Sequence, residues 1–81
     1  ERQERERRRQ EISRLLEDAR IAFRRGHLKD AQQLCEQVLQ VGRVGPAHEL
    51  LGDVLVRQGR LHEAAGHYTI AAQMTPANGL I

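Results

Sequence analysis

Apolar residues recur at spacings of three and four in four successive segments of the chain, which is the pattern of helices that each bury one face. In the first two segments these residues are Ile12, Leu15, Leu16, Ala19, Ala22 and Phe23, followed by Leu28, Ala31, Leu34, Cys35, Val38 and Leu39. In the last two they are Ala47, Leu50, Leu51, Val54 and Leu55, followed by Leu61, Ala64, Ala65, Tyr68, Ala71 and Ala72. The pattern predicts an all-α fold of amphipathic helices.

Glycine and proline residues separate these segments. Gly26 and Gly59 each follow a segment, and a residue without a side chain readily takes the left-handed backbone conformation that ends a helix. The stretch GRVGP at 42–46 combines two glycines with a proline, and Pro76 follows the last segment. We therefore expect two antiparallel helical hairpins joined at 42–46.

The two hairpins, at 12–44 and 45–78, repeat one unit. Three pairs of landmark residues are each 33 positions apart, namely Gly26 and Gly59, Leu28 and Leu61, and Ala31 and Ala64. Unrelated helices would not keep a common register, so the chain contains one supersecondary unit twice. On this reading residues 77–81 begin a third unit.

The repeated unit resembles the tetratricopeptide repeat, a helix–turn–helix of about 34 residues with the pattern W-x₂-L-G-x₂-Y, then A-x₃-F, then P. The second unit follows this pattern at His48, Leu51, Gly52, Leu55, Ala64, Tyr68, Ala71 and Pro76. The first unit keeps mainly the small-residue frame, at Leu15, Asp18, Ala19, Ala22, Ala31, Cys35 and Val38. It has Arg43 where the family has Pro. The resemblance implies an α-solenoid of stacked hairpins.

The resemblance also implies a protein-interaction or scaffold module. In this family the first helix of each hairpin lines a concave groove in which peptides or protein segments lie. The matching positions here are Ser13, Glu17, Arg20, Phe23, Arg24, Glu49, Asp53, Val56 and Arg57, with Leu16 and Leu50 on the same face.

The charges on this face are mixed. Arg20 and Arg24 are one helical turn apart and suit carboxylate or phosphate oxygens, whereas Glu49 and Asp53 form an acidic pair. The alternative to a binding role is that the basic and acidic pairs neutralise each other across neighbouring helices.

Residues 1–11 form a charged segment ahead of the first apolar stripe. Its basic residues are Arg2, Arg5, Arg7, Arg8 and Arg9. They alternate with glutamates, so that Glu1 with Arg5 and Glu4 with Arg8 have the favourable i,i+4 order for ion pairs on a helix. We expect a solvated helical extension, with nucleic-acid contact through the arginines as an alternative that no aromatic residue supports.

Two repeats leave apolar faces uncovered, because each repeat of this type buries its face on the next and three are the usual minimum. We expect that a second copy of the chain or further repeats cover the open end. The chain begins with Glu1 rather than Met, so we interpret it as a segment of a larger protein.

Composition narrows the class of protein further. Hydrophobic residues make up 40% of the 81 residues and the net charge is +2, values typical of a small globular domain and not of a nucleic-acid protein. The single Cys35 excludes an intrachain disulfide, and no apolar run is long enough to cross a membrane, so we expect a cytoplasmic protein.

Catalytic and metal-binding patterns are not expected either. Ser13 has no histidine near it in sequence, and Cys35 lies on an apolar stripe, where a buried structural thiol is the expected role. The histidines lack metal-ligand spacing, because His62 and His67 are five residues apart and His48 is on another helix. We predict no enzyme, cofactor or metal site. The alternative is a regulatory appendage of an enzyme or of a J-domain-type chaperone.

Overall fold

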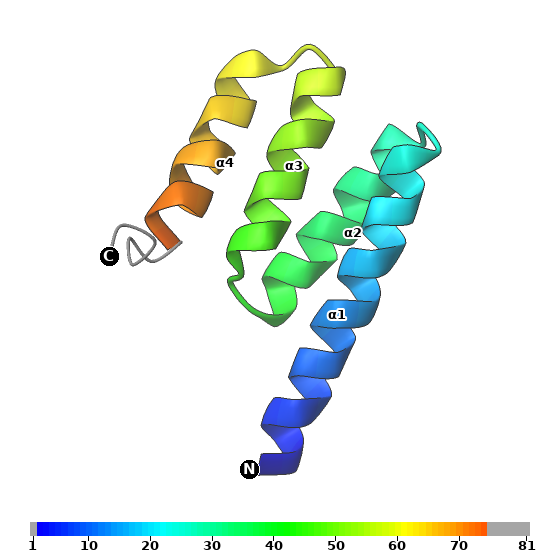
Figure 1. The fold of residues 1–81 in the computed structure, drawn as a ribbon, viewed down its shortest axis with the longest axis vertical. Coiled ribbons are helices and arrows are strands. Elements are labelled where there is room, and N and C mark those ends of the chain that lie inside the picture. Colours follow the sequence, from blue (N-terminus) through cyan, green and yellow to red (C-terminus); the bar gives the residue numbers. More distant parts are fainter. Residues whose placement is uncertain (1, 75–81) are drawn as a thin grey trace, which may run out of the picture.

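A computed structural model describes residues 2–74 of the chain as four helices in sequence order (Figure 1). These are α1 (Arg2–Arg24), α2 (Leu28–Val41), α3 (Gly45–Arg57) and α4 (Leu61–Met74). The predicted all-α class is therefore confirmed for this part of the chain. Glu1, Pro76 and the expected start of a third unit at 77–81 lie outside the described residues.

The helices form two antiparallel hairpins that lie side by side (Figure 1). Helix α1 packs on α2, and α3 packs on α4, while α2 forms most of the contact between the hairpins. A smaller contact joins α1 to α3. The α1–α3 side is the face on which the resemblance placed a groove.

The two hairpins turn in the same way. Gly26 and Gly59 have φ angles of 81° and 79°, in the left-handed region that favours glycine. In the first turn the amide of His27 donates to the carbonyl of Ala22 at 2.9 Å. In the second turn, 33 residues further on, the amide of Arg60 donates to the carbonyl of Leu55 at 2.8 Å. These bonds use carbonyls that the helix end leaves free, so the repeated glycine sets the corner of each hairpin.

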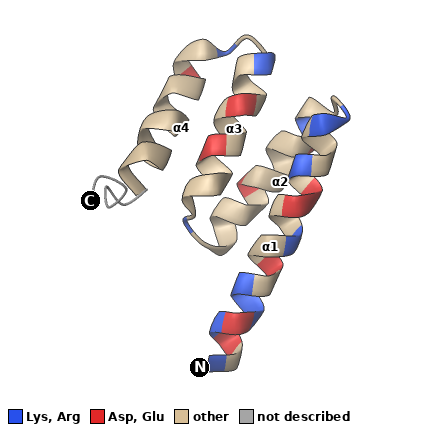
Figure 2. Cartoon of the chain, in the orientation of Figure 1, with Lys and Arg blue, Asp and Glu red and all other residues tan. Residues whose placement is uncertain are grey.

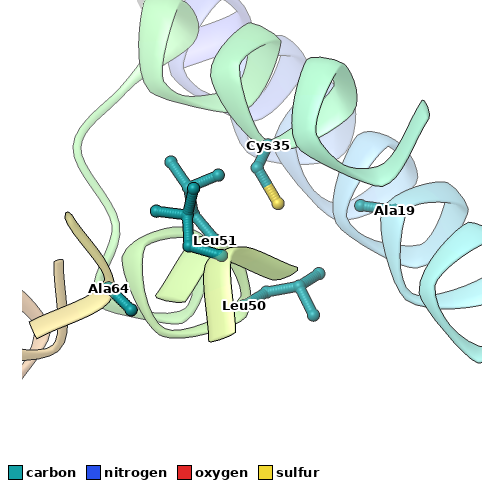
Figure 3. Close-up of a cluster of buried hydrophobic side chains, with 6 residues drawn as sticks. Ala19, Cys35, Leu50, Leu51 and Ala64 are labelled. Carbon is teal, nitrogen blue, oxygen red and sulfur yellow. The ribbon is translucent and has the colours of Figure 1, made fainter. Parts of the chain in front are cut away.

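The hydrophobic core joins both hairpins (Figure 3). One cluster takes residues from all four helices and consists of Ala19, Cys35, Leu50, Leu51, Leu55 and Ala64. A second cluster, of Leu15, Leu16, Val38 and Ala47, lies among the first three helices. Because α3 contributes side chains to both clusters, neither hairpin has a core of its own.

Small residues allow the paired helices to approach closely. At Gly52 on α3, an added Cβ atom would lie 2.7 Å from a ring carbon of Tyr68 on α4. The positions 33 residues earlier hold Ala19 and Cys35, both without exposed surface. In the first hairpin, a smaller side chain on α2 thus accompanies a larger residue on α1.

The apolar stripe predicted for the last helix is only partly buried. Leu61 is 64% exposed, and Ala65 and Ala72 are also exposed, so the prediction was wrong at these positions. The buried positions of α4 are Ala64 and Ala71. Within the described residues α3 is the one helix that packs against α4, so its outward side has nothing to contact.

Helix α1 is much longer than its counterpart α3. It has 23 residues against 13, and at 1.5 Å per residue it extends for about 35 Å. Residues 2–11 continue the helix without a break and are exposed throughout. The charged head therefore projects beyond the connection between α2 and α3 (Figure 1).

Candidate functional site

Helices α1 and α3 present the positions that the sequence predicted for a groove. Among them, Ser13, Glu17, Arg20, Arg24, Glu49, Val56 and Arg57 are exposed, and Phe23 and Asp53 are half-buried. Leu16 and Leu50 are only 7% and 8% exposed, because both belong to the hydrophobic clusters. Leu16 was therefore wrongly placed on the binding face, whereas Leu50 still reaches the surface of a cleft.

This cleft lies between α1 and α3 and has a volume of about 230 Å³. Its lining residues are Arg20, Pro46, Glu49, Leu50 and Asp53. The structure thus brings the basic position of the first hairpin and the acidic pair of the second to one depression. Ser13, Glu17, Phe23, Arg24, Val56 and Arg57 do not line it.

No direct ion pair joins the charged residues of the cleft within residues 2–74. The ion pairs within 4.0 Å among residues 2–74 are Arg14 with Asp18 and Arg60 with Glu63, both between neighbours on the surface. Neutralisation of Arg20 by Glu49 or Asp53 through a direct ion pair, the alternative left open by the sequence, is thus not found. Figure 2 shows two acidic segments on α3 and both basic and acidic segments on α1. Arg20 and Glu49 remain exposed and available to a ligand.

A cation–π contact connects the two helices at the far end of this face. The guanidinium carbon of Arg57 lies 4.5 Å from the centre of the Phe23 ring. Such a contact adds about 0.5–1 kcal/mol at an exposed site. Phe23 also packs against the main core cluster, so this pair supports the packing of α1 on α3.

Asp53 has a structural partner on the last helix. The hydroxyl of Tyr68 donates a hydrogen bond to the carboxylate of Asp53. This bond to the Asp53 carboxylate, with burial and the nearby charges adding to it, raises the pKa of Tyr68 to about 12. The bond uses one oxygen of Asp53, so Arg20 and Glu49 are the more available charges of the cleft.

Two histidines that the sequence did not connect meet between α3 and α4. The Nδ1 atoms of His48 and His67 are 3.0 Å apart, and the ring centres are 5.3 Å apart at an interplanar angle of 26°. The distance between the ring centres equals the nitrogen–nitrogen distance plus about two ring radii. The two nitrogens therefore lie close to the line that joins the ring centres. This is the geometry of an N–H···N hydrogen bond, with one neutral ring donating and the other accepting.

The environment of His48 favours its neutral form. Burial lowers the pKa of His48, and the neighbouring His67 and Arg43 lower it further. A neutral His48 can accept the hydrogen bond from His67. Metal-ligand spacing in the sequence gives no sign of this pair, because the two residues are 19 positions apart on different helices.

Cys35 has the buried structural position that the sequence predicted. The thiol has no exposed surface, and burial raises its pKa to about 11. Because the thiolate is the reactive form, this thiol is poorly suited to nucleophilic attack. Within residues 2–74, moreover, no cluster of three or more His, Cys, Asp or Glu side chains has the arrangement to hold a metal ion.

Two larger clefts lie outside the predicted face. One, of about 370 Å³, runs between α1 and α2 and has residues of both charges on its walls, including Asp18, Arg25 and Asp30. The other, of about 390 Å³, lies beside the charged head of α1. None of the described helices is long and apolar enough to cross a membrane.

Comparisons with known proteins returned no relative of this chain. No protein-family model, no curated protein and no solved structure matches it.

Proposed function

We propose that the chain is a non-catalytic protein-interaction module of the tetratricopeptide type, and that it binds a peptide or protein segment against α1 and α3. The cleft between these helices carries the proposal. It combines exposed Arg20 and Glu49, which have no ion-pair partner within 4.0 Å among residues 2–74, with an apolar contribution from Leu50. A ligand with both an acidic and a basic group fits these charges.

A binding role also agrees with the state of the reactive side chains. The His48 and His67 rings bond to each other, the Tyr68 hydroxyl bonds to Asp53, and Cys35 is buried. These groups stabilise contacts between helices. We also place the protein in the cytoplasm, where a free thiol such as Cys35 stays reduced.

We further propose that the outward side of α4 is covered in the assembled protein, by a further repeat or by a second copy. The counterpart helix α2 packs on α1 and also on α3, whereas α4 packs on α3 alone within the described residues. Ile70 and Met74 are 39% and 38% exposed on α4. Sedimentation equilibrium tests whether a second copy covers this side. We expect a dimer that Ile70→Glu converts to a monomer. A wild-type monomer at about 100 μM would contradict dimerisation.

The cleft is tested with peptides selected from a random phage-displayed library on the immobilised chain. Peptides that use the cleft should bind the Arg20→Ala/Glu49→Ala variant at least about tenfold more weakly, since two charge-assisted contacts are lost. The matched control is Lys29→Ala/Glu36→Ala, which removes one charge of each sign from exposed positions of α2. Selected peptides that bind both variants as tightly as the wild type, or a selection without enrichment, would contradict the proposed site.

A further inference from the structure

The charged head of α1 forms one wall of a cleft that the proposed peptide site does not include. This cleft has a volume of about 390 Å³ and lies between α1 and the connection from α2 to α3. It is lined by Arg5, Arg8, Arg9, Ile12, Ser13, Val41, Gly42 and Val44. We name it the basic cleft.

The basic cleft is apolar at its base and positive at its rim. Ile12, Val41 and Val44 are half-buried and pack against the second core cluster. The charged residues that line the cleft are three arginines, all exposed, and no acidic residue is among the lining residues. A ligand that enters the cleft therefore meets aliphatic surface and then positive charge.

No direct ion pair within residues 2–74 engages the three arginines. Glutamates share this part of α1, and the sequence predicted an ion pair between Glu4 and Arg8. No such pair within 4.0 Å is formed among residues 2–74, so that prediction was wrong. Both side chains are exposed, and on a solvated helix such a pair contributes only a few tenths of a kcal/mol, too little to hold it in one geometry. Glu1, the predicted partner of Arg5, lies outside the described residues. Among residues 2–74, no ion pair within 4.0 Å engages Arg5, Arg8 or Arg9, so these residues offer their guanidinium groups to an external anion.

We propose that the basic cleft binds an acidic protein segment that carries an aliphatic side chain. The aliphatic side chain packs on Ile12, Val41 and Val44, and the flanking carboxylates bind the arginines. Arginine suits this role because its planar guanidinium group accepts a carboxylate in a two-bond geometry. The basic cleft adds a second, chemically distinct contact to the module, since none of its arginines lines the cleft between α1 and α3.

An acidic peptide fits the basic cleft better than a nucleic acid does. The aliphatic base of Ile12, Val41 and Val44 suits an apolar side chain, which a phosphate backbone lacks. Binding of single strands also relies on aromatic side chains that stack on bases. The chain has one Phe and one Tyr, and both are engaged at the core, far from this end of α1 in the sequence.

Fluorescence anisotropy with labelled peptides tests the proposal. The probe is the acidic peptide DDEILDE, titrated with the full chain at near-physiological salt. We expect binding in the micromolar range that falls at least about tenfold when Arg5→Gln and Arg8→Gln are combined. The matched control, Arg2→Gln/Arg7→Gln, removes the same charge from the same helix outside the lining of the cleft and should change affinity less than about threefold.

Three further measurements make the result decisive. The peptide DDESSDE, which lacks the aliphatic pair, should bind at least about tenfold more weakly if the apolar base takes part. The Arg20→Ala/Glu49→Ala variant should bind DDEILDE as the wild type does, so failure of the groove proposal leaves this one standing. Circular dichroism at 222 nm shows whether each variant keeps its helices.

Other results would overturn the proposal. Equal losses in the two arginine double variants would mean that only net charge matters. Equal affinity for DDEILDE and DDESSDE would exclude the apolar base, and the absence of saturable binding would exclude the site. Tighter binding of a single-stranded oligonucleotide of twelve nucleotides, abolished by Arg5→Gln/Arg8→Gln, would assign the cleft to nucleic acid instead.

Discussion

Helices α2 and α4 are the same element of the repeat in two different environments. Their bounds, Leu28–Val41 and Leu61–Met74, differ by 33 residues at both ends. Helix α2 packs on α1 and on α3, whereas α4 packs on α3 alone within the described residues. Leu28 of α2 is half-buried, whereas the corresponding Leu61 of α4 is 64% exposed. The place of a helix in the stack thus decides how much of its apolar side is buried.

The two hairpins also divide the space between their helices differently. In the first, Ala19 on α1 accompanies the thiol of Cys35 on α2. In the second, Gly52 on α3 contacts the ring of Tyr68 on α4. A larger side chain on one helix requires a smaller one on the other, because the interhelical space is already filled.

The largest effect on stability should come from truncating a buried side chain of α2. Val38→Ala removes two methyl groups from a site without exposed surface and should lower the free energy of unfolding by about 2–3 kcal/mol. The control on α4, Leu61→Ala, changes a side chain that is 64% exposed and should cost less than about 0.5 kcal/mol. Urea denaturation at equilibrium measures both, and equal losses would mean that α4 is buried as deeply as α2.

Replacing Gly52, the small residue between the helices of the second hairpin, should have the next largest effect on stability. Gly52→Ala places a Cβ atom 2.7 Å from the Tyr68 ring. The overlap should cost about 1–3 kcal/mol, of which the better helix propensity of Ala offsets about 1 kcal/mol. In a Tyr68→Cys background, which copies the first hairpin, the same change should cost nothing. Additive losses in this double-mutant cycle would show that the ring and the glycine do not constrain each other.

The hydroxyl of Tyr68 distinguishes the second hairpin from the first, where the corresponding residue is Cys35. Tyr68→Phe keeps the ring against Gly52 and removes the hydrogen bond to Asp53. We expect a loss of about 1 kcal/mol, the usual net contribution of one hydrogen bond. Thermal unfolding followed by circular dichroism measures it, and an unchanged midpoint would mean that water replaces the bond without loss.

The smallest effect we expect is a decrease in the free energy of unfolding in mild acid. It arises from the pair of histidines, which only the second hairpin has. The pKa of His48 is lowered in the folded protein, so the unfolded chain binds the proton more readily. Stability is therefore complete above the ordinary pKa of 6.5 and is lost as the pH falls through 6.5 toward the lower folded value. The slope stays below about 1.4 kcal/mol per pH unit, the limit for one proton.

Urea titrations at about pH 7.5 and about pH 5.5, on either side of that pKa, measure this dependence. The His27→Gln/His62→Gln variant removes two exposed histidines and should keep the dependence, whereas His48→Gln should reduce it. A dependence that follows the exposed histidines would contradict the role of the pair.

Much of the fold could be predicted from the sequence, because it depends on local signals. The apolar spacing predicted the helices, and Gly26 and Gly59 predicted the corners, since a left-handed residue is a property of the backbone at one position. The long-range contacts could not be predicted in this way. Whether His48 meets His67 depends on the register and rotation of α3 against α4, which no local spacing encodes.

The candidate site shows the same division. Sequence reasoning identified Arg20 and Glu49 by their place in the repeat, and the structure brings both to one cleft. It did not predict that Phe23 would contact Arg57 or that Asp53 would bind Tyr68, because either residue had several possible partners. Charge alone left open an ion pair of Arg20 with Glu49 or Asp53, and none is formed within 4.0 Å among residues 2–74.

By itself, the sequence of this protein determined the all-α class, the repeated hairpin and the glycine corners, because backbone preference and apolar periodicity act over a few residues. Only the tertiary structure decided which apolar positions are covered and which charges remain free. Those outcomes depend on the neighbours that each helix meets, and α2 and α4, with the same bounds in the repeat, meet different ones.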